Sequence, residues 1–376
     1  MTSRYVSEKR VMKNNYEALL ALVRAGLWQN DNHNDNLNLD HVDWIKVYDM
    51  AEAQGVTGLV AAGIEKLIIQ IPLEVKLQFV GSTLQIEQRN KAMDAFIADI
   101  VERMRREGIY TLLVKGQGVA QCYEKPLWRP SGDVDFLLSE DNYKKARAFL
   151  LPLSTGNKDE ERYSQHLGMN IGEWYVEIHG SLRTGLSGRI DKMVDAVQRD
   201  MFYGGNVRSW QNCKTQVFLP SPTNDVFLVF THFIKHFYKE GMSLRQLCDW
   251  CRLMWTYKDT LNYELLEKWI KKSGLTAEWA AFGTLAVNLL GMPKEAMPTL
   301  GSRFLDEPSD KVERKVQGSK SSAKAERLVN FILNGCHGKV KDTFEIAKIF
   351  PWHTIKFLPS IFLNVNGLKI RERLFA

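Results

Sequence analysis

The sequence predicts an α+β fold in which a small mixed β-sheet core is flanked by N- and C-terminal helical regions. One observation is that apolar residues recur at helical spacing through most of the chain. The other is a group of short apolar runs, bounded by Gly and Pro, between residues 106 and 185. These patterns divide the chain into a helical region 1–105, a sheet core 106–185, a second helical region 186–305, a linker 306–325 and a C-terminal helical segment 326–376.

The first helical region contains four expected helices. Apolar residues between Tyr16 and Leu27 recur on one face, and an Asn- and Asp-rich loop follows. A second helix is expected after Asp40 and a third over Thr57–Leu67. A long helix is predicted from about Leu73 to Glu107, which would lead directly into the sheet core.

The sheet core alternates short apolar runs with helical ones. Its expected strands and helices are Tyr110–Val114 (strand), Val119–Tyr123 (helix), Val134–Leu138 (strand), Asn142–Leu151 (helix), Gly168–Ile171 (strand) and Glu173–His179 (strand). The last two strands are predicted to form a hairpin around Gly172.

Beyond residue 185 the pattern is helical again. One short strand is expected at Gln216–Leu219, and strong helices are expected over Asn224–Tyr238 and Ser243–Tyr257. Residues 306–325 are polar and rich in Lys and Ser, which is typical of an exposed linker.

Composition and charge limit the class of protein. Of 376 residues, 45% are hydrophobic and 25% are charged, which are globular values. The net charge of +6 suits phosphate-bearing ligands but is not a strong sign of nucleic-acid binding. Five scattered cysteines favour a reducing compartment, and no apolar run is long enough to span a membrane. With a polar N-terminus, Met1–Asn14, this predicts a cytoplasmic protein.

Three acids lie inside apolar runs, where an isolated carboxylate is costly to bury. Asp133 and Asp135 occupy alternate positions of one expected strand, so their side chains would share a face. Glu177 has the same apolar setting and fits a neighbouring strand. Carboxylates held close together repel one another, and Mg²⁺ relieves this because it prefers oxygen ligands. The pattern therefore predicts a metal site at Asp133, Asp135 and Glu177.

A glycine turn precedes the acids. In Lys115-Gly116-Gln117-Gly118, the glycines would let backbone N–H groups approach phosphates closely. Lys115 either neutralises phosphate or pairs with one of the acids. Arg129, four residues before Asp133, is a candidate triphosphate contact or else an ordinary surface arginine.

Several polar residues leave alternatives open. His179 would share the face of Glu177 and could orient the metal ligands, touch the substrate or serve as a structural histidine. His166, which precedes the same hairpin, has less support for such a role. His232 and His236, four apart on a helix, could line a nucleotide cleft, bind zinc or pack in the core. The Cys-x-x-Cys pair Cys248 and Cys251 favours core packing over a redox or zinc site. Arg245 and Asp249 could form a helix-surface pair or contact a base or ribose; the surface pair is favoured.

Three segments carry a family resemblance: Leu113-Val114-Lys115-Gly116, Arg129 to Leu137 with its Gly-Asp-Val-Asp, and Val176-Glu177-Ile178-His179. They resemble the polymerase-β-like nucleotidyltransferase superfamily, and within it the bacterial uncharacterised nucleotidyltransferase family. The resemblance is strong over about residues 105–185 and implies a small mixed sheet with helices on one side. One position departs from the pattern, because Gln117 stands where much of the superfamily has Ser or Gly.

The resemblance implies Mg²⁺-dependent transfer of an NMP from an NTP, with Mn²⁺ as an alternative ion. Asp133 and Asp135 would bind metal and triphosphate, and Glu177 would bind a second metal or act as general base. Nucleotide contacts are expected from Lys115, Gly116, Gln117, Arg129, Gly132 and His179. The expected acceptor is a hydroxyl of a small molecule, glycan precursor or protein. Three alternatives remain: transfer to RNA 3′ ends, a non-catalytic nucleotide-binding regulatory module, and a helical scaffold.

Overall fold

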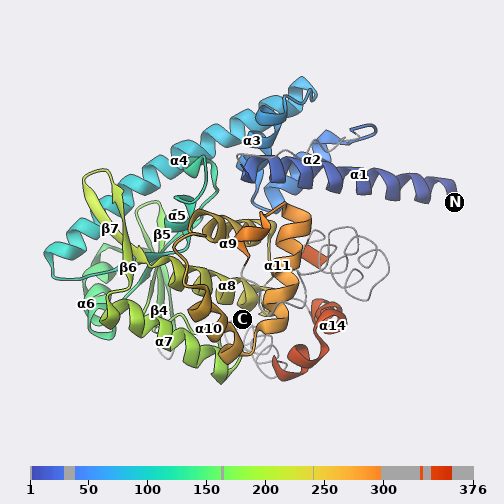
Figure 1. The fold of residues 1–376 in the computed structure, drawn as a ribbon. Helices are drawn as coiled ribbons and strands as arrows, with labels where there is room; N and C mark the ends of the chain where they lie inside the picture. Colours follow the sequence, from blue (N-terminus) through green and yellow to red (C-terminus); the bar gives the residue numbers. More distant parts are fainter. Residues whose placement is uncertain are drawn as a thin grey trace, which may run out of the picture.

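The computed structural model describes residues 2–28, 39–161, 165–239, 241–297, 331–332 and 340–357. The expected linker 306–325 and most of the expected C-terminal segment 326–376 lie outside the described residues. Within the described residues the fold is α+β, mostly helical, with a five-stranded mixed sheet flanked by helices (Figure 1). The predicted fold class is therefore confirmed.

Four helices precede the sheet: α1 Thr2–Leu27, α2 Trp44–Ala53, α3 Thr57–Leu67 and α4 Leu73–Arg106. Helices α1 and α3 pack closely because glycine occurs at their contact. A Cβ on Gly26 would lie 2.1 Å from the carbonyl oxygen of Leu59, and one on Gly63 would lie 2.1 Å from that of Leu22. Helix α4 runs from these helices to the sheet, where Met93 and Ile97 join the sheet core (Figure 1).

The sheet has the strand order β1-β2-β5-β4-β3. The strands are β1 Leu112–Val114, β2 Asp133–Leu137, β3 Thr155–Glu161, β4 His166–Ile171 and β5 Trp174–His179. Strands β2 and β5 are parallel, and the other pairs are antiparallel, so the sheet is mixed as predicted. The expected hairpin around Gly172 joins β4 to β5. Between the strands lie α5 Gly116–Ala120, η1 Pro126–Trp128, α6 Glu140–Leu150 and η2 Leu151–Leu153.

The remaining described elements are α7 Gly188–Gly204, β6 Val207–Asn212, β7 Thr215–Pro220, α8 Pro222–Lys239, α9 Leu244–Thr256, α10 Tyr263–Ser273, α11 Thr276–Leu290, η3 Lys294–Ala296 and α14 Val340–Ile349. The sequence predicted one strand here, but the structure has the hairpin β6–β7. Strand β3 was not predicted from the sequence. That strand reads Thr-Gly-Asn-Lys-Asp-Glu-Glu and lies at the edge of the sheet, so it lacks the apolar pattern of a buried strand.

Two hydrophobic cores support the site. The larger one joins α1–α3 to α8, α9 and α11, with Phe230, Phe233, Trp250 and Trp279 fully buried at its centre. The smaller one lies between the sheet, α4 and α6. Cys248 and Cys251 are buried in the larger core, so the core-packing interpretation of that pair is confirmed. Among the described residues, no helix is both long and apolar enough to cross a membrane.

Candidate functional site

The parallel pairing of β2 with β5 brings the three acids together. The register sets Asp135 directly opposite Glu177, and Asp133 lies two residues earlier on the same face of β2. One carboxylate oxygen from each of the three residues lies within 4.8 Å of the other two. The sequence-based expectation that Glu177 occupies a strand next to the Asp-x-Asp strand is thus confirmed.

Asp135 is the most deeply buried acid of the three, with 2% of its surface exposed. Its Oδ1 atom accepts a hydrogen bond from Lys115 Nζ at 2.8 Å and lies 2.8 Å from His179 Nε2. Burial alone would raise the pKa of Asp135, but Lys115 and His179 outweigh it and hold the pKa below its usual value. Asp135 is therefore a stable anion at neutral pH.

Lys115 reaches Asp135 from an unusual backbone conformation. Its φ of 59° and ψ of −145° lie in a region that residues with side chains rarely adopt, at a cost of about 1–3 kcal/mol. The residue links the end of β1 to the start of α5, and Gly116, with φ of 34°, continues the turn. From this strained turn the side chain of Lys115 reaches Asp135 on β2.

Glu177 faces two histidines. His166 Nε2 lies 3.2 Å and His179 Nε2 lies 3.3 Å from the same atom, Glu177 Oε2. Burial raises the pKa of Glu177, but the two imidazoles and Lys115 hold it well below its ordinary value. His179 therefore bridges Asp135 and Glu177, while His166 contacts Glu177 from the neighbouring strand β4.

Asp133 has the opposite electrostatic balance. Burial, and then the neighbouring charge of Asp135, raise its pKa above the ordinary value, although Lys115 partly counteracts this. The raised pKa of Asp133 thus comes first from its burial and second from the charge of Asp135. Three convergent carboxylates are the oxygen ligands that a hard divalent cation prefers, so the residues fit Mg²⁺.

The turn residues divide between two roles. Lys115, Gly116 and Gly132 line the cleft above the acids, as expected for phosphate contacts. Gly118 is not among the residues that line the cleft. A Cβ at this position would lie 2.9 Å from Leu219 Cδ2 of β7. Its glycine serves close packing against the β6–β7 hairpin. The expectation that the Gly118 backbone approaches a phosphate stays a prediction.

The side chain of Gln117 points away from the cleft. Its amide nitrogen donates to Asp94 of α4 at 2.7 Å, and its amide oxygen accepts from Ser131 at 3.0 Å. Burial raises the pKa of Asp94 to about 6, although this hydrogen bond lowers it. Gln117 thus ties the glycine turn to α4 and to the loop that leads into β2, so any contribution to phosphate binding would come from its backbone.

Arg129 lies in a buried ion pair. Its Nε and Nη2 atoms donate to the two carboxylate oxygens of Asp249 at 2.8 and 2.6 Å, and its Nη1 donates to Ser131 at 2.8 Å. Tyr123 also donates to Asp249, at 2.7 Å. A direct contact between Arg129 and a triphosphate would require this arrangement to open. The favoured surface pair of Arg245 with Asp249 is wrong, because Asp249 is buried against Arg129 and Arg245 donates to Pro130.

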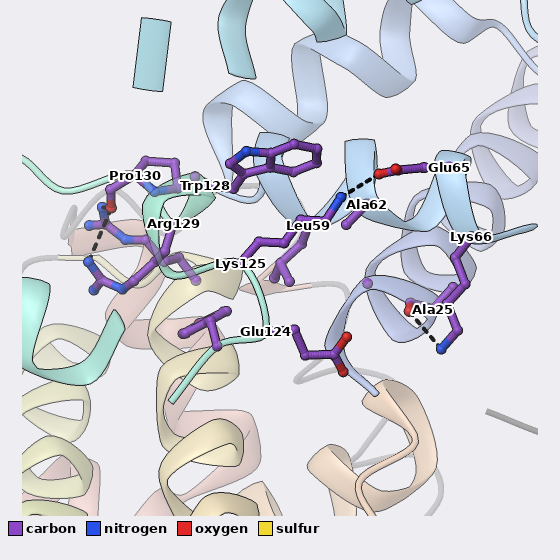
Figure 2. Close-up of a pocket in the computed structure, with 15 residues that line it drawn as sticks. Ala25, Leu59, Ala62, Glu65, Lys66, Glu124, Lys125, Trp128, Arg129 and Pro130 are labelled. Atoms are coloured by element: carbon purple, nitrogen blue, oxygen red, sulfur yellow. Dashed lines mark hydrogen bonds and ion pairs between the residues drawn. The ribbon is translucent and has the colours of Figure 1, made fainter. Parts of the chain in front are cut away.

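A second pocket of about 280 Å³ lies beside this ion pair, between α1, α3 and the 123–130 segment. Figure 2 shows Arg129 and Pro130 at one end of it, and Glu65 and Lys66 at the other. Arg129 and Arg245 line both this pocket and the cleft of the acids. The ion pair is therefore part of a wall between two cavities.

The comparisons with known proteins agree with the geometry. The model of a family described as uncharacterised nucleotidyltransferase matches residues 40–291. The chain belongs to this nucleotidyltransferase family. No curated protein and no solved structure matches it. Family membership makes an NTP the expected substrate and leaves the acceptor open.

The nucleotidyltransferase cleft has a volume of about 1270 Å³. The acids and the glycine turn form one side, and the 180–185 segment with residues from α7, α8 and α9 forms much of the rest. His232 and His236 are among them, which confirms that this helix face lines the cleft. Their Nε2 atoms lie 3.0 Å apart, and burial, followed by Lys115, lowers the pKa of His232 well below its ordinary value. Neither residue belongs to a three-ligand group among the described residues, so zinc gains no support.

His166 had little support from the sequence, and nothing in the sequence pointed to Asp94, Ser131 or Tyr123. A signal for His166 was available, because a tight hairpin around Gly172 places residue 166 opposite residue 179. The other three had none, since they act through contacts between segments distant in the sequence.

Proposed function

We propose that this protein transfers a nucleotidyl group from an NTP to a hydroxyl acceptor with the help of Mg²⁺ or Mn²⁺. The observation that carries the proposal is the convergence of Asp133, Asp135 and Glu177 within 4.8 Å at one side of a large cleft. Such a cluster attracts a divalent cation and the triphosphate that accompanies it. Family membership supports the reaction class.

Each residue has a role in the proposed reaction. Asp133 and Asp135 hold metal and triphosphate, and Glu177 completes the ligand set. A bound divalent ion would stabilise the charge that develops on the phosphate oxygens. Of the two roles expected for Glu177, its lowered pKa favours metal ligand over general base, since a weakly basic carboxylate is a poor proton acceptor.

Other residues position the phosphates and the acids. Lys115 lies within 2.8 Å of Asp135 and lines the cleft, so we propose that it also meets a phosphate. Gly116 and Gly132 leave room for phosphate beside the backbone, and the backbone of Gln117 belongs to the same turn. His179 orients Asp135 and Glu177 through its contacts to both. Arg129, engaged with Asp249, holds the loop before β2 in place.

The acceptor we favour is a small molecule, a glycan precursor or a protein side chain, within the cytoplasm. The chain lacks interleaved aromatic and basic residues of the kind that stack single-stranded bases, so RNA 3′ ends remain the less favoured acceptor. A non-catalytic nucleotide-binding module is the alternative from another class. The three intact acids support catalysis over that alternative.

The test combines binding with transfer. Melting temperature is measured with ATP, GTP, CTP and UTP, each with and without Mg²⁺ or Mn²⁺, for the wild type, Asp135→Asn and the exposed control Asp141→Asn. A ligand that binds only the folded state raises the melting temperature. We expect a metal-dependent rise for at least one nucleotide in the wild type and the control, and none in Asp135→Asn.

The donor identified in this way is then supplied with an α-³²P label to candidate acceptors. Loss of transfer by at least about 10³-fold in Asp135→Asn, with transfer kept in Asp141→Asn, is the expected result for a group that holds the reacting metal. Binding without transfer to any acceptor favours the regulatory module. Transfer that persists in Asp135→Asn contradicts the proposed mechanism.

A further inference from the structure

Two groups of three metal-ligating side chains converge within the part of the chain that the structure describes, and they share one residue. The first is the acid triplet Asp133, Asp135 and Glu177. The second is His166, Glu177 and His179, called here the imidazole triplet. In each triplet, one ligand atom per residue lies within 4.8 Å of the other two.

The sheet builds the imidazole triplet. Strands β4 and β5 are antiparallel, and their register sets His166 opposite His179, so both side chains stand on the face that carries Glu177. The two rings are stacked, with centroids 4.8 Å apart and an interplanar angle of 24°. The backbone of two paired strands therefore fixes both imidazoles, which a pair of loop residues would not achieve.

Two of the three distances between ligand atoms fit coordination directly. Ligand atoms that share an ion at about 2.0–2.2 Å lie about 3.0–3.5 Å from one another in tetrahedral or octahedral geometry. The Nε2 atoms of His166 and His179 lie 3.2 and 3.3 Å from the same oxygen of Glu177. All three residues also line the cleft, so an ion bound there would have further coordination positions open to solvent or substrate.

The donor atoms differ between the triplets, and so should the preferred ions. The acid triplet offers oxygens alone, which suit Mg²⁺. Two imidazole nitrogens and one carboxylate suit borderline ions such as Co²⁺ and Zn²⁺ far better than Mg²⁺, and Mn²⁺, although harder, also accepts imidazole ligands. Because Glu177 belongs to both triplets, its carboxylate can bridge two ions at the spacing of about 3.5–4 Å that two-metal sites use.

We propose that His166, Glu177 and His179 form a second metal position that selects a borderline divalent ion and shares Glu177 with the acid triplet. The protein would then hold two different ions side by side. This goes beyond the proposed transfer reaction, which needs the acid triplet alone. The competing explanation is that the imidazoles are only hydrogen-bond partners, His166 of Glu177 and His179 of both Asp135 and Glu177.

The experiment uses the full chain and Mn²⁺ as the probe, detected by electron paramagnetic resonance. Pulsed spectra reveal nitrogen atoms bound to Mn²⁺, and titration gives the number and affinity of bound ions. The test variant is His166→Gln, because His166 lies outside the acid triplet. The matched control is His236→Gln, which removes a cleft-lining histidine that belongs to neither triplet. Asp133→Asn removes a ligand of the acid triplet alone.

We expect the wild type and His236→Gln to bind Mn²⁺ with imidazole nitrogen couplings. In His166→Gln the affinity of the nitrogen-coordinated ion should fall at least about tenfold. Asp133→Asn should keep the nitrogen couplings. Wild-type spectra without nitrogen couplings, wild-type affinity in His166→Gln, or couplings lost in Asp133→Asn would each overturn the proposal.

This outcome is separable from that of the proposed function. Mg²⁺-dependent nucleotide binding should survive in His166→Gln, because the acid triplet is complete in that variant. If the imidazole triplet holds no ion but nucleotide still binds with Mg²⁺, only the second metal position is lost. Melting temperatures of the apo variants show whether His166→Gln has kept the fold.

Discussion

Asp135 and Asp249 are both buried carboxylates in the same cleft, yet their surroundings differ. Asp249 is matched by one bidentate arginine, Arg129, and by the hydroxyl of Tyr123. Asp135 is paired with Lys115 and His179 but also lies beside two further acids. The carboxylate of Asp249 is matched by a bidentate arginine, with Arg245 also near it, whereas Asp135 lies in a crowded set of three acids around Lys115.

The difference separates a structural ion pair from a binding site. A balanced buried pair leaves little demand for another ion, and breaking it strands a charge in the interior. A crowded set of acids has unfavourable repulsion that a cation relieves. Removing the carboxylate should therefore destabilise the protein at Asp249, and it should stabilise the metal-free protein at Asp133, the acid of the triplet whose pKa is raised.

The largest expected effect is at Asp249. Asp249→Ala leaves the Arg129 guanidinium buried without its partner, so the free energy of unfolding should fall by about 3–5 kcal/mol. Urea denaturation of the variant and of the wild type measures this. The double variant Arg129→Met/Asp249→Leu, which removes both charges, should recover part of the loss. A loss below about 1 kcal/mol in Asp249→Ala would show that the pair of Arg129 and Asp249 is not needed for the stability of the fold.

A smaller effect of opposite sign is expected at Asp133. Its pKa is raised by burial and by Asp135, so ionised Asp133 opposes folding near neutral pH. Asp133→Asn should therefore raise the free energy of unfolding of the metal-free protein, by about 0.5–2 kcal/mol. Urea denaturation at pH 7 with a chelator measures the gain.

Added Mg²⁺ gives the control for Asp133. It should stabilise the wild type more than Asp133→Asn, since the variant has lost a ligand of the ion. A variant that is less stable than the metal-free wild type would contradict the view that ionised Asp133 opposes folding.

The sequence predicted the two sites unequally, for a physical reason. Asp133, Asp135 and Glu177 lie on strands, and the two-residue period of a strand shows which side chains share a face. Lys115 precedes them in the same unit. The pair of Arg129 with Asp249 joins residues 120 positions apart across α9 and the loop before β2, and no local pattern reports it.

The difference between local sequence patterns and long-range contacts also explains which strands were not predicted. The buried strands β2 and β5 were predicted because their acids lie within short runs that are otherwise mostly apolar. The polar edge strand β3 and strand β6, whose sequence Val-Arg-Ser-Trp-Gln-Asn is largely polar, are fixed by pairing with a neighbour. Gln117 shows the limit at single residues: its place in the turn was visible, but its partners on α4 and at Ser131 were not.

The effect that depends most on pH concerns Asp94, a carboxylate whose side chain has an amide partner instead of a cation. Its pKa is raised to about 6 by burial, against an ordinary value of 3.8. The folded protein therefore holds this proton more tightly than the unfolded chain does. The associated stability is fully present below about pH 4 and is lost as pH rises through about 6. Asp94→Asn should remove this decline while its side-chain oxygen still accepts from Gln117.

Denaturation of the wild type and of Asp94→Asn across pH 4–8 tests this, and the quantity to follow is the difference between their free energies of unfolding. Other groups titrate in the same window but contribute equally to both proteins, so they cancel. The difference should grow in favour of Asp94→Asn between pH 4 and 6 and then level off. Parallel curves would mean that Asp94 ionises as readily in the fold as in water. In that case the amide of Gln117 would be enough to stabilise the ionised form of the partly buried Asp94. The difference between Asp135 and Asp249 would then come mainly from the neighbouring acids of Asp135 and less from the cations paired with each carboxylate.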